Sequence, residues 1–422
     1  MGIAHEKEPA LLVSREDELR EVAARLARAQ RVALDIESNG LFKYKATLCT
    51  MQLATADEVV VVDTLAVPLH ALSDLLGPNG PPKIVHDIAF DARILAESKL
   101  LLANVLDTSL AARMLGRAAT GLASLMSSEL GVTLDKKLQH HDWTERPIQR
   151  HQLRYLADDV IHLEALADKL WAEIEQRETA GAWGIAEAIE EETRYRLAQA
   201  ISAAGSVDPR PPYIRLKGID RVPKEELPIL RRIAELRETK ARSLDVPPYK
   251  VIGPDVLFAI AKARPRTLDE LSRVRGATSG HRARSLASSM LAAVAAGLAD
   301  DGIPDEERRL LDRPRLPSSV LKERRARESR LTAWRKSEAK KRGVDEQVVL
   351  PGHCLQDLAD LADDATLERV CAIPGLGALR AERDGRALLS ALAAAPHPGS
   401  AHPTAPEPEA EGVSASADAE VS

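Results

Sequence analysis

Hydrophobic positions in the first part of the chain form short, nearly continuous runs. They occupy residues 31–38, 48–54 and 58–63, and the last contains four valines between Glu58 and Asp63. An alternation of apolar and polar positions fades there into unbroken apolar sequence, which is typical of strands covered on both faces of a sheet. A shorter run at residues 83–86 predicts one more strand. We therefore expect a central sheet in this region.

The segments around these strands have the spacing of helices. A helix predicted from Leu69 to Leu76 ends at a turn sequence with two glycines and a proline. Further helices are expected at residues 88–97, 109–115, 122–130 and 149–178, with a loop at 134–146. The long last helix carries a buried apolar side, made by Leu153, Leu156, Val160, Leu163 and Leu170. Strands mixed with helices predict an α/β sandwich.

The remainder of the chain reads as helical. Pro209, Pro211 and Pro212 indicate a linker, and helix starts follow at Pro223, Pro254 and Thr267, the last as a capping box with Glu270. A weaker copy of this helical pattern runs from about 318 to 394 and ends with a Gly-Leu-Gly turn at 375–377. That turn could offer amides to a phosphate or be a simple interhelix turn. At 422 residues the chain should form several domains, expected at 1–180, 181–209 (a linker helix and the Pro-rich linker), 210–298 and 315–395, with a disordered tail at 396–422.

Acidic and basic residues are unevenly distributed along the chain, which bears on its partners. The net charge is −6 overall, but residues 210–297 hold 18 Lys/Arg against 9 Asp/Glu, and residues 321–342 hold 10 against 3. Residues 1–180 hold 20 against 27. Basic helical segments beside an acidic domain favour nucleic-acid binding, although a well-solvated helical surface gives the same composition.

Composition narrows the class of protein further. Aromatic residues make up only 3% of the chain, and its three cysteines, Cys49, Cys354 and Cys371, are scattered, so no disulfide framework is expected. The first residues lack the pattern of a signal peptide, and the most apolar stretch, 286–299, is too short to span a bilayer. We expect a cytoplasmic protein with no membrane partner.

Three separated acidic positions carry the candidate chemistry. Asp35 and Glu37 are two residues apart on a predicted strand, so both carboxylates leave the same face of the sheet. Tyr155 and Asp159 are four apart on a predicted helix and share one side of it, while Asp91 lies between these clusters in the sequence. Carboxylate oxygens suit Mg²⁺ or Mn²⁺, and acidic sites for two divalent metal ions mostly move phosphate groups. Each of these acidic groups alone is more often an ordinary surface charge. The three groups together, in this order, predict a site for divalent metal ions.

Other polar residues are weaker candidates. His140 and His141 are adjacent, and adjacent residues rarely converge on one ion, so a surface loop is favoured. Asp158 lies about 100° around the helix from Asp159 and should face away from the cluster. Asp87 and Asp107 are expected to be caps or exposed charges, and His162 could lie near the site without a predicted role.

At these residues the chain resembles a known family. Residues 32–37 with 51–54, 83–86 with Asp91, and 142–147 with Gln152 and Tyr155-x-x-x-Asp159 resemble the three exonuclease motifs of ribonuclease D. The segment 230–276 resembles the helicase-and-ribonuclease-D C-terminal (HRDC) domain. The resemblance implies a ribonuclease H-like exonuclease domain followed by all-α HRDC-type domains, and the tyrosine subclass of DEDD exonucleases. It also implies catalytic roles for Asp35, Glu37, Asp91, Tyr155 and Asp159, the four acids holding two metal ions.

The expected activity follows from this resemblance. It implies a metal-dependent 3′→5′ exoribonuclease that releases nucleoside 5′-monophosphates from structured, tRNA-like RNA precursors with 3′ extensions. Tyr155, with a reference pKa near 10, is a poor base at neutral pH and is expected to orient the attacking water. A DNA 3′→5′ exonuclease, with DNA as a possible partner, and a non-catalytic nucleic-acid-binding scaffold are the alternatives.

Overall fold

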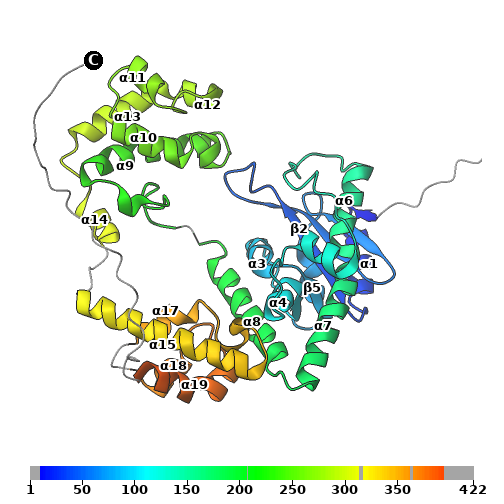
Figure 1. The fold of residues 1–422 in the computed structure, drawn as a ribbon. Coiled ribbons are helices and arrows are strands. Elements are labelled where there is room, and N and C mark those ends of the chain that lie inside the picture. Colours follow the sequence, from blue (N-terminus) through cyan, green and yellow to red (C-terminus); the bar gives the residue numbers. More distant parts are fainter. Residues whose placement is uncertain (1–9, 207, 313–316, 362–364, 394–422) are drawn as a thin grey trace, which may run out of the picture.

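The computed structural model describes residues 10–206, 208–312, 317–361 and 365–393. These residues form three lobes, one that contains a sheet and two that are helical (Figure 1). The sheet-containing lobe carries the segments that resemble the exonuclease motifs and is called the nuclease lobe below. The predicted disordered tail, 396–422, lies outside the described residues.

The centre of the first lobe is a six-stranded mixed sheet. Its strand order is β1-β4-β3-β2-β5-β6, with β2–β3 and β3–β4 antiparallel and the remaining pairs parallel. The strands are β1 (Leu11–Val13), β2 (Val32–Ser38), β3 (Leu48–Ala54), β4 (Val59–Asp63), β5 (Lys83–Val85) and β6 (Val105–Asp107). The sheet thus confirms the α/β architecture expected from the hydrophobic runs.

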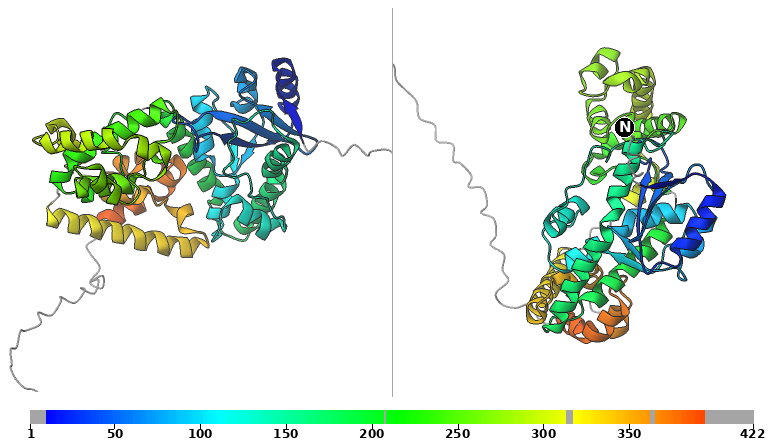
Figure 2. Two further views of the ribbon diagram at one scale, coloured as in Figure 1. Left: turned by 90° about the horizontal axis from the view of Figure 1, so that it is seen from above. Right: turned by 90° about the vertical axis from the view of Figure 1, so that its right-hand side faces the viewer.

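Helices cover both faces of this sheet (Figure 2). Val32, Leu34 and Ile36 of β2 join a core that includes α1 and α3, whereas Ala33 joins a core that includes α4 and α7. The helices of this lobe are α1 (Glu16–Leu26), α2 (Ser73–Leu76), α3 (Ile88–Glu97), α4 (Thr108–Met114), α5 (Leu122–Leu125), α6 (Arg150–Ile161), α7 (Leu163–Thr179) and α8 (Ile185–Ala203). Short helical turns lie at Leu69–Leu72 and Met126–Leu130. Because apolar side chains of β2 alternate between faces, Asp35 and Glu37 point to the Ala33 side.

The prediction of a single long helix at 149–178 is wrong, because the structure has two helices there. The helical segment is divided at His162 into α6 and α7. The strands β1 and β6 and the helix α1 were not predicted; each of the two strands has only three residues, too few for a period to be visible.

The first helical domain comprises residues 210–312. Its helices are α9 (Leu227–Ser243), α10 (Pro254–Ala263), α11 (Leu268–Arg273), α12 (Gly280–Ser285), α13 (Ala287–Ala299) and α14 (Asp305–Leu311), with short turns at Ile219–Arg221, Lys224–Glu226 and Pro248–Lys250. α14 packs on this domain, since Glu307 accepts hydrogen bonds from the Tyr213 hydroxyl (2.9 Å) and from Arg231. Thr267 caps α11 as predicted, accepting from the Glu270 amide at 3.2 Å. The return bond of the predicted capping box differs, because the Glu270 side chain accepts from the Arg266 amide (2.6 Å) one residue before the cap.

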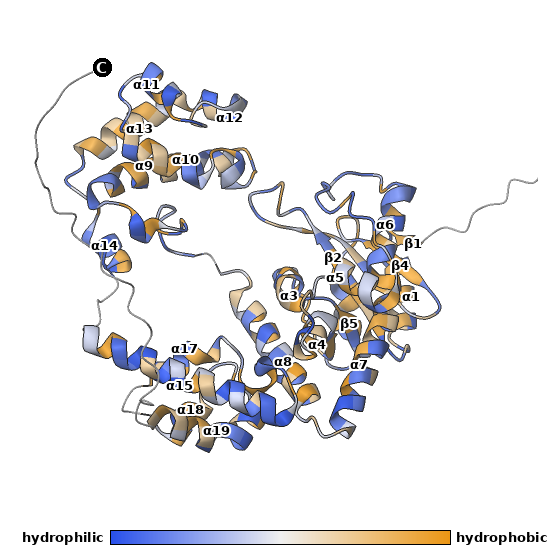
Figure 3. Ribbon diagram, in the orientation of Figure 1, coloured by the Kyte–Doolittle hydropathy of each residue, from blue (hydrophilic) through white to orange (hydrophobic). Residues whose placement is uncertain are grey.

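The second helical domain comprises residues 317–393. Its helices are α15 (Ser318–Arg342), α16 (Glu346–Val349), α17 (Cys354–Ala359), α18 (Leu367–Cys371) and α19 (Ala378–Ala393). The long α15 is largely hydrophilic (Figure 3), in keeping with its excess of Lys and Arg. No helix in the described ranges combines the length and apolar character needed to cross a bilayer.

Helix α8 joins the nuclease lobe to the second helical domain. Its Ile185, Ala188 and Ile189 share a core with α4 and α7, and Val348 of α16 enters the same core. Glu191 of α8 and Arg380 of α19 form an ion pair at 2.9 Å in which both side chains are only 1% exposed. The expected linker helix is therefore packed between two domains.

The Glu191 carboxylate also contacts the Gly-Leu-Gly turn at residues 375–377. Glu191 accepts a hydrogen bond at 2.6 Å from the Leu379 amide in the first turn of α19, and a Cβ on Gly377 would collide with the Glu191 carboxylate. An internal carboxylate thus takes the amide hydrogen bond and the space that a phosphate would need at this turn. The interhelix-turn interpretation is correct, and the phosphate-binding one is wrong.

Candidate active site

Asp35 and Glu37 project from the same side of β2, as their spacing predicts. β2 is held on both edges, by β3 (Asp35 opposite Gln52, Glu37 opposite Thr50) and by β5, and an irregularity after Glu37 ends the regular pairing. The two carboxylates therefore sit at the end of a strand in the middle of the sheet, where the backbone is fixed.

Helix α6 brings Tyr155 and Asp159 to this point. The helix begins at a capping box in which the Gln149 amide donates to the Gln152 side chain at 2.6 Å. Its apolar residues Leu153, Leu156 and Ala157 pack on the sheet, which turns the adjacent side of the helix towards β2. Carboxylate oxygens of Asp35, Glu37 and Asp159 all lie within 4.8 Å of one another.

Asp91 comes from α3 and stands slightly apart. It lies outside the set of three that meets the 4.8 Å limit. Its side chain is buried, and the charges of Asp35 and Glu37 act on it strongly enough to raise its pKa further. Asp35, Glu37, Asp91 and Asp159 are called the acidic cluster below.

Burial and mutual repulsion dominate the electrostatics of the acidic cluster. Burial raises the pKa of Glu37 to about 9, with the charges of Asp35 and Asp159 adding to the effect. The pKa values of Asp35, Asp159 and Asp91 are also raised, in each case mainly by burial. Within the described residues no Lys, Arg or His forms an ion pair with any of the four. Such a group of carboxylates is stable in the ionised form only with added positive charge.

The donor set fits divalent cations. It offers hard carboxylate oxygens and no thiolate or imidazole, which matches Mg²⁺ or Mn²⁺ better than zinc. The absence of a basic partner among the described residues and the short distances between the carboxylates also favour bound cations. The residues present therefore suit the divalent metal ions that the resemblance implies.

Tyr155 lies between the acidic cluster and an aromatic side chain. Its pKa is raised, first by burial and then by the charges of Asp159 and Glu37. Its ring centroid is 5.8 Å from that of Trp143. The phenol therefore stays protonated at neutral pH, beside the carboxylates.

Trp143 is a residue of the site that was quoted in a motif but not predicted to act there. It is only 2% exposed, and its indole N–H faces Glu37 and partly offsets the rise in the pKa of Glu37, without reaching full hydrogen-bond geometry. Arg146 fixes this loop, donating to the Trp143 carbonyl (2.8 Å) and forming a bidentate pair with Asp63 (2.7 Å for each bond). No spacing rule links residue 143 to residue 37; only the fold does.

His141 lies in the predicted loop and belongs to no candidate metal group of the described residues, but it is less exposed than expected. His141 is partly buried, its Nε2 lies 2.7 Å from Gln152 Nε2, and its ring meets Trp143 edge-on at 5.0 Å. His140 is exposed, as expected.

The remaining weaker candidates lie outside the cluster. Asp107 caps α4, accepting from the amides of Ser109 and Leu110, and Asp87 carries an exposed side chain paired with Arg196 at 3.4 Å. Asp158 does not belong to the group of close carboxylates, and His162 is the residue at the break between α6 and α7.

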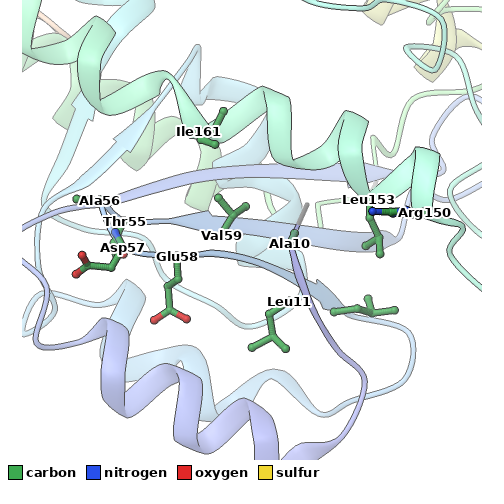
Figure 4. Close-up of a pocket in the computed structure, with 11 residues that line it drawn as sticks. Ala10, Leu11, Thr55, Ala56, Asp57, Glu58, Val59, Arg150, Leu153 and Ile161 are labelled. Carbon is green, nitrogen blue, oxygen red and sulfur yellow. The ribbon is translucent and has the colours of Figure 1, made fainter. Parts of the chain in front are cut away.

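A cavity of about 900 Å³ opens beside Glu37. Its walls come from the β2–β3 loop, from α3 and from the segment after α8, and they include Leu41, Phe90 and Arg93 as well as Trp143. A second hollow of about 810 Å³ lies between β1, the β3–β4 turn and α6 (Figure 4). None of the five predicted site residues lines that second hollow, and Glu37 alone of the five lines the larger cavity. The larger cavity therefore meets the acidic cluster at Glu37.

Comparison with known proteins agrees with this geometry. Residues 11–175 match the family model described as 3′-5′ exonuclease, and residues 226–294 and 324–392 each match the HRDC domain. The ribonuclease D of Gluconacetobacter diazotrophicus is 32% identical over 308 residues, covering 71% of this chain and 75% of the relative. That of Nitrobacter hamburgensis is 30% identical over 296 residues, covering 69% and 74%.

Solved structures share the fold over most of the chain. The crystal structure of Escherichia coli RNase D, titled an exoribonuclease involved in structured RNA processing, covers 91% of this chain and 98% of its own with a TM-score of 0.63 at 23% identity. A protein from Bifidobacterium adolescentis covers 92% and 99% with a TM-score of 0.73 at 21% identity. With its exonuclease domain, its two HRDC domains and relatives of this identity and coverage, the chain belongs to the ribonuclease D family of 3′→5′ exoribonucleases.

Proposed function

We propose that the acidic cluster is the catalytic centre of this exoribonuclease, with Asp35, Glu37, Asp91 and Asp159 as ligands of two divalent ions, Mg²⁺ or Mn²⁺. The observation that carries the proposal is the approach of three carboxylates within 4.8 Å with no basic partner among the described residues. When bound, such ions supply an activated water and stabilise the leaving 3′-oxygen of a phosphodiester.

Residues of the acidic cluster and its neighbours would bind the ions, orient the attacking water and close the site. The carboxylates would fix the position of the cations, while the buried Trp143 would close one side of the site next to Glu37. Tyr155 keeps its proton at neutral pH, so its hydroxyl serves to orient the attacking water and not to deprotonate it.

We propose that the substrates are structured RNA precursors with 3′ extensions, of the size and kind of tRNA precursors. Each product would be a nucleoside 5′-monophosphate. The support is a division of charge, with an acidic nuclease domain and an excess of Lys and Arg in residues 210–297 and 321–342. The basic helical domains would hold the body of the RNA by its phosphates, and the single-stranded 3′ end would enter the cavity at Glu37.

Matched substrates test this proposal. A tRNA-sized RNA with a short 3′ extension and a DNA of the same sequence, both labelled at the 3′ end, are digested with Mg²⁺ or Mn²⁺, and the products are sized. We expect labelled mononucleotides as the first product and faster digestion of RNA than of DNA. Equal or faster digestion of the DNA would contradict the RNA assignment, and labelled first products longer than one nucleotide would contradict stepwise attack from the 3′ end.

A further inference from the structure

The first helical domain contacts the nuclease lobe through the loop between β2 and β3. The polar and ring contacts between these two parts of the described chain fall on residues 41–44, at the tip of this loop. In Figure 1 the loop extends from β2 towards the domain that contains α9 and α10. The second helical domain, in contrast, docks through the buried core around α8.

Tyr44 is the centre of this contact. Its hydroxyl donates to Glu238 at 2.5 Å and accepts from Arg242 Nε at 2.7 Å, and its ring packs against the apolar core of the first helical domain. Glu238 is 6% exposed, so this acceptor is fixed inside the domain.

Neighbours of Tyr44 extend the contact on both sides. Lys43 pairs with Asp245 at 2.9 Å, and Lys250 lies 4.0 Å above the Phe42 ring. The Tyr249 hydroxyl donates to the Leu41 carbonyl at 3.2 Å. Four consecutive loop residues are thus held by the other domain.

The same loop forms a wall of the active-site cavity. It follows Glu37 directly, and Gly40, Leu41 and Tyr44 line the cavity together with Glu37. Its base is closed by the Thr47 amide, which donates to the Asn39 side chain at 2.7 Å. Arg215, from the first helical domain, lines the cavity as well and pairs with Glu238 at 3.0 Å. The cavity wall is therefore held at its base by the nuclease and at its tip by Glu238 and its neighbours.

We propose that Tyr44 is a positioning residue, through which the first helical domain holds the wall of the active-site cavity in the conformation that accepts an RNA 3′ end. The domain then contributes to turnover on RNA too short to reach its basic surface. This inference rests on the proposed role of Glu37. It goes beyond binding of the RNA body, because it predicts an effect on the rate that does not depend on RNA length.

Tyr44→Phe tests the proposal, because it removes the two hydroxyl hydrogen bonds and keeps the ring. Hydrogen bonds to charged groups stabilise a contact enough that we expect kcat/KM on a tetraribonucleotide to fall by about 10-fold. Affinity for a tRNA-sized RNA should stay within about twofold. Hydrogen–deuterium exchange at residues 39–47 should become faster, while exchange in α9 stays unchanged.

Tyr213→Phe is the matched control. It removes a hydroxyl bond to a glutamate of the same kind, Glu307, inside the same domain and away from the loop. It should leave the tetranucleotide rate and loop exchange unchanged. Arg242→Gln, which removes a partner of Tyr44 from the other side of the contact, should slow the tetranucleotide reaction in the same direction as Tyr44→Phe.

The outcomes separate this inference from the proposed function. Wild-type rates and wild-type loop exchange in both Tyr44→Phe and Arg242→Gln would overturn the positioning role. A fall in affinity for long RNA with an unchanged tetranucleotide rate would overturn it too, and would assign these residues to RNA binding. Retained activity in Glu37→Gln, in contrast, would refute the proposed catalytic centre itself.

Discussion

At the scale of single residues, the buried Asp91 and the partly buried Asp35, Glu37 and Asp159, without a basic partner among the described residues, make the metal-free protein sensitive to pH. Their folded-state pKa values lie above those of ordinary carboxyl groups, so the folded chain binds protons more tightly than the unfolded chain. The contribution of these groups to stability is present at low pH. It is lost as the pH rises from about 4 through the raised values, which for Glu37 reach about 9.

This linkage predicts the pH dependence of stabilisation by metal. Mg²⁺ competes with protons for the same oxygens, so the rise in Tm on adding Mg²⁺ should be larger at about pH 8.5 than at about pH 6. Differential scanning fluorimetry in the presence of EDTA or Mg²⁺ measures it. An equal rise at both values of pH would show that the cation stabilises the protein elsewhere.

Tyr155→Phe separates orientation of water from binding of metal. Loss of one positioned hydroxyl should slow turnover by about 10²–10⁴-fold. Metal-dependent stabilisation should remain, because the four carboxylates are intact. An unchanged rate, measured on the same short RNA, would mean that Tyr155 only packs against Trp143.

At the scale of helices and strands, the buried pair between α8 and α19 is the strongest test of how the second helical domain is attached. Glu191→Gln leaves Arg380 buried without its counter-charge, which should lower the free energy of unfolding by about 3–5 kcal/mol. The exposed pair of Glu190 and Arg194 on the same helix provides the control. Glu190→Gln should change stability by less than about 1 kcal/mol in chemical denaturation. Equal effects of the two variants would contradict the docking described here.

Most strands of the sheet could be predicted from the sequence. β2, β3, β4 and β5 were predictable because each is an apolar run of sufficient contrast. The spacing of Asp35 and Glu37 on a strand, and of Tyr155 and Asp159 on a helix, was enough to predict that each pair shares one face, because i, i+2 and i, i+4 fix side-chain direction locally. That Asp35, Glu37 and Asp159 lie close together is a property of the fold. β1 and β6 were too short to show a period.

Features that depend on contacts between distant segments could not be predicted in this way. Trp143 reaches Glu37 only because Arg146 ties its loop to Asp63 on β4. The docking of Tyr44 on Glu238 joins residues almost two hundred positions apart, and no local pattern marks it. The Gly-Leu-Gly turn looked like a phosphate site because the sequence does not reveal that Glu191 fills it.

At the scale of the whole molecule, the two helical domains are attached differently. The second helical domain is attached by buried contacts, since Val348 packs in a core of the nuclease lobe and Arg380 pairs with Glu191 of α8. Cutting the chain after α8 would therefore leave the buried carboxylate of Glu191 without its partner. The RNA-binding role of the first domain is therefore better tested by removing charge than by truncation.

Arg275→Ser with Arg284→Ser makes that test, since both side chains are exposed and neither forms an ion pair within the described residues. Affinity for a tRNA-sized RNA should fall, and the slope of log K against log salt should become shallower by about 0.7–0.9 for each phosphate that is no longer neutralised. Arg113→Ser, at an exposed position of the nuclease lobe, is the control for the removal of charge alone. Unchanged affinity and slope would assign these arginines to ordinary solvated surface.

We propose that the acidic cluster holds the ions on which the 3′→5′ exoribonuclease activity of this chain depends. Asp159→Asn removes one charge and keeps the size of the side chain, and its RNA digestion and its Mg²⁺-dependent rise in Tm are measured on the same preparation. We predict that the mutant keeps the Tm of the metal-free fold or exceeds it, loses most of the Mg²⁺-dependent rise, and releases no nucleotides under conditions in which the wild type digests the RNA completely. Wild-type turnover together with a wild-type response to Mg²⁺ would contradict the claim.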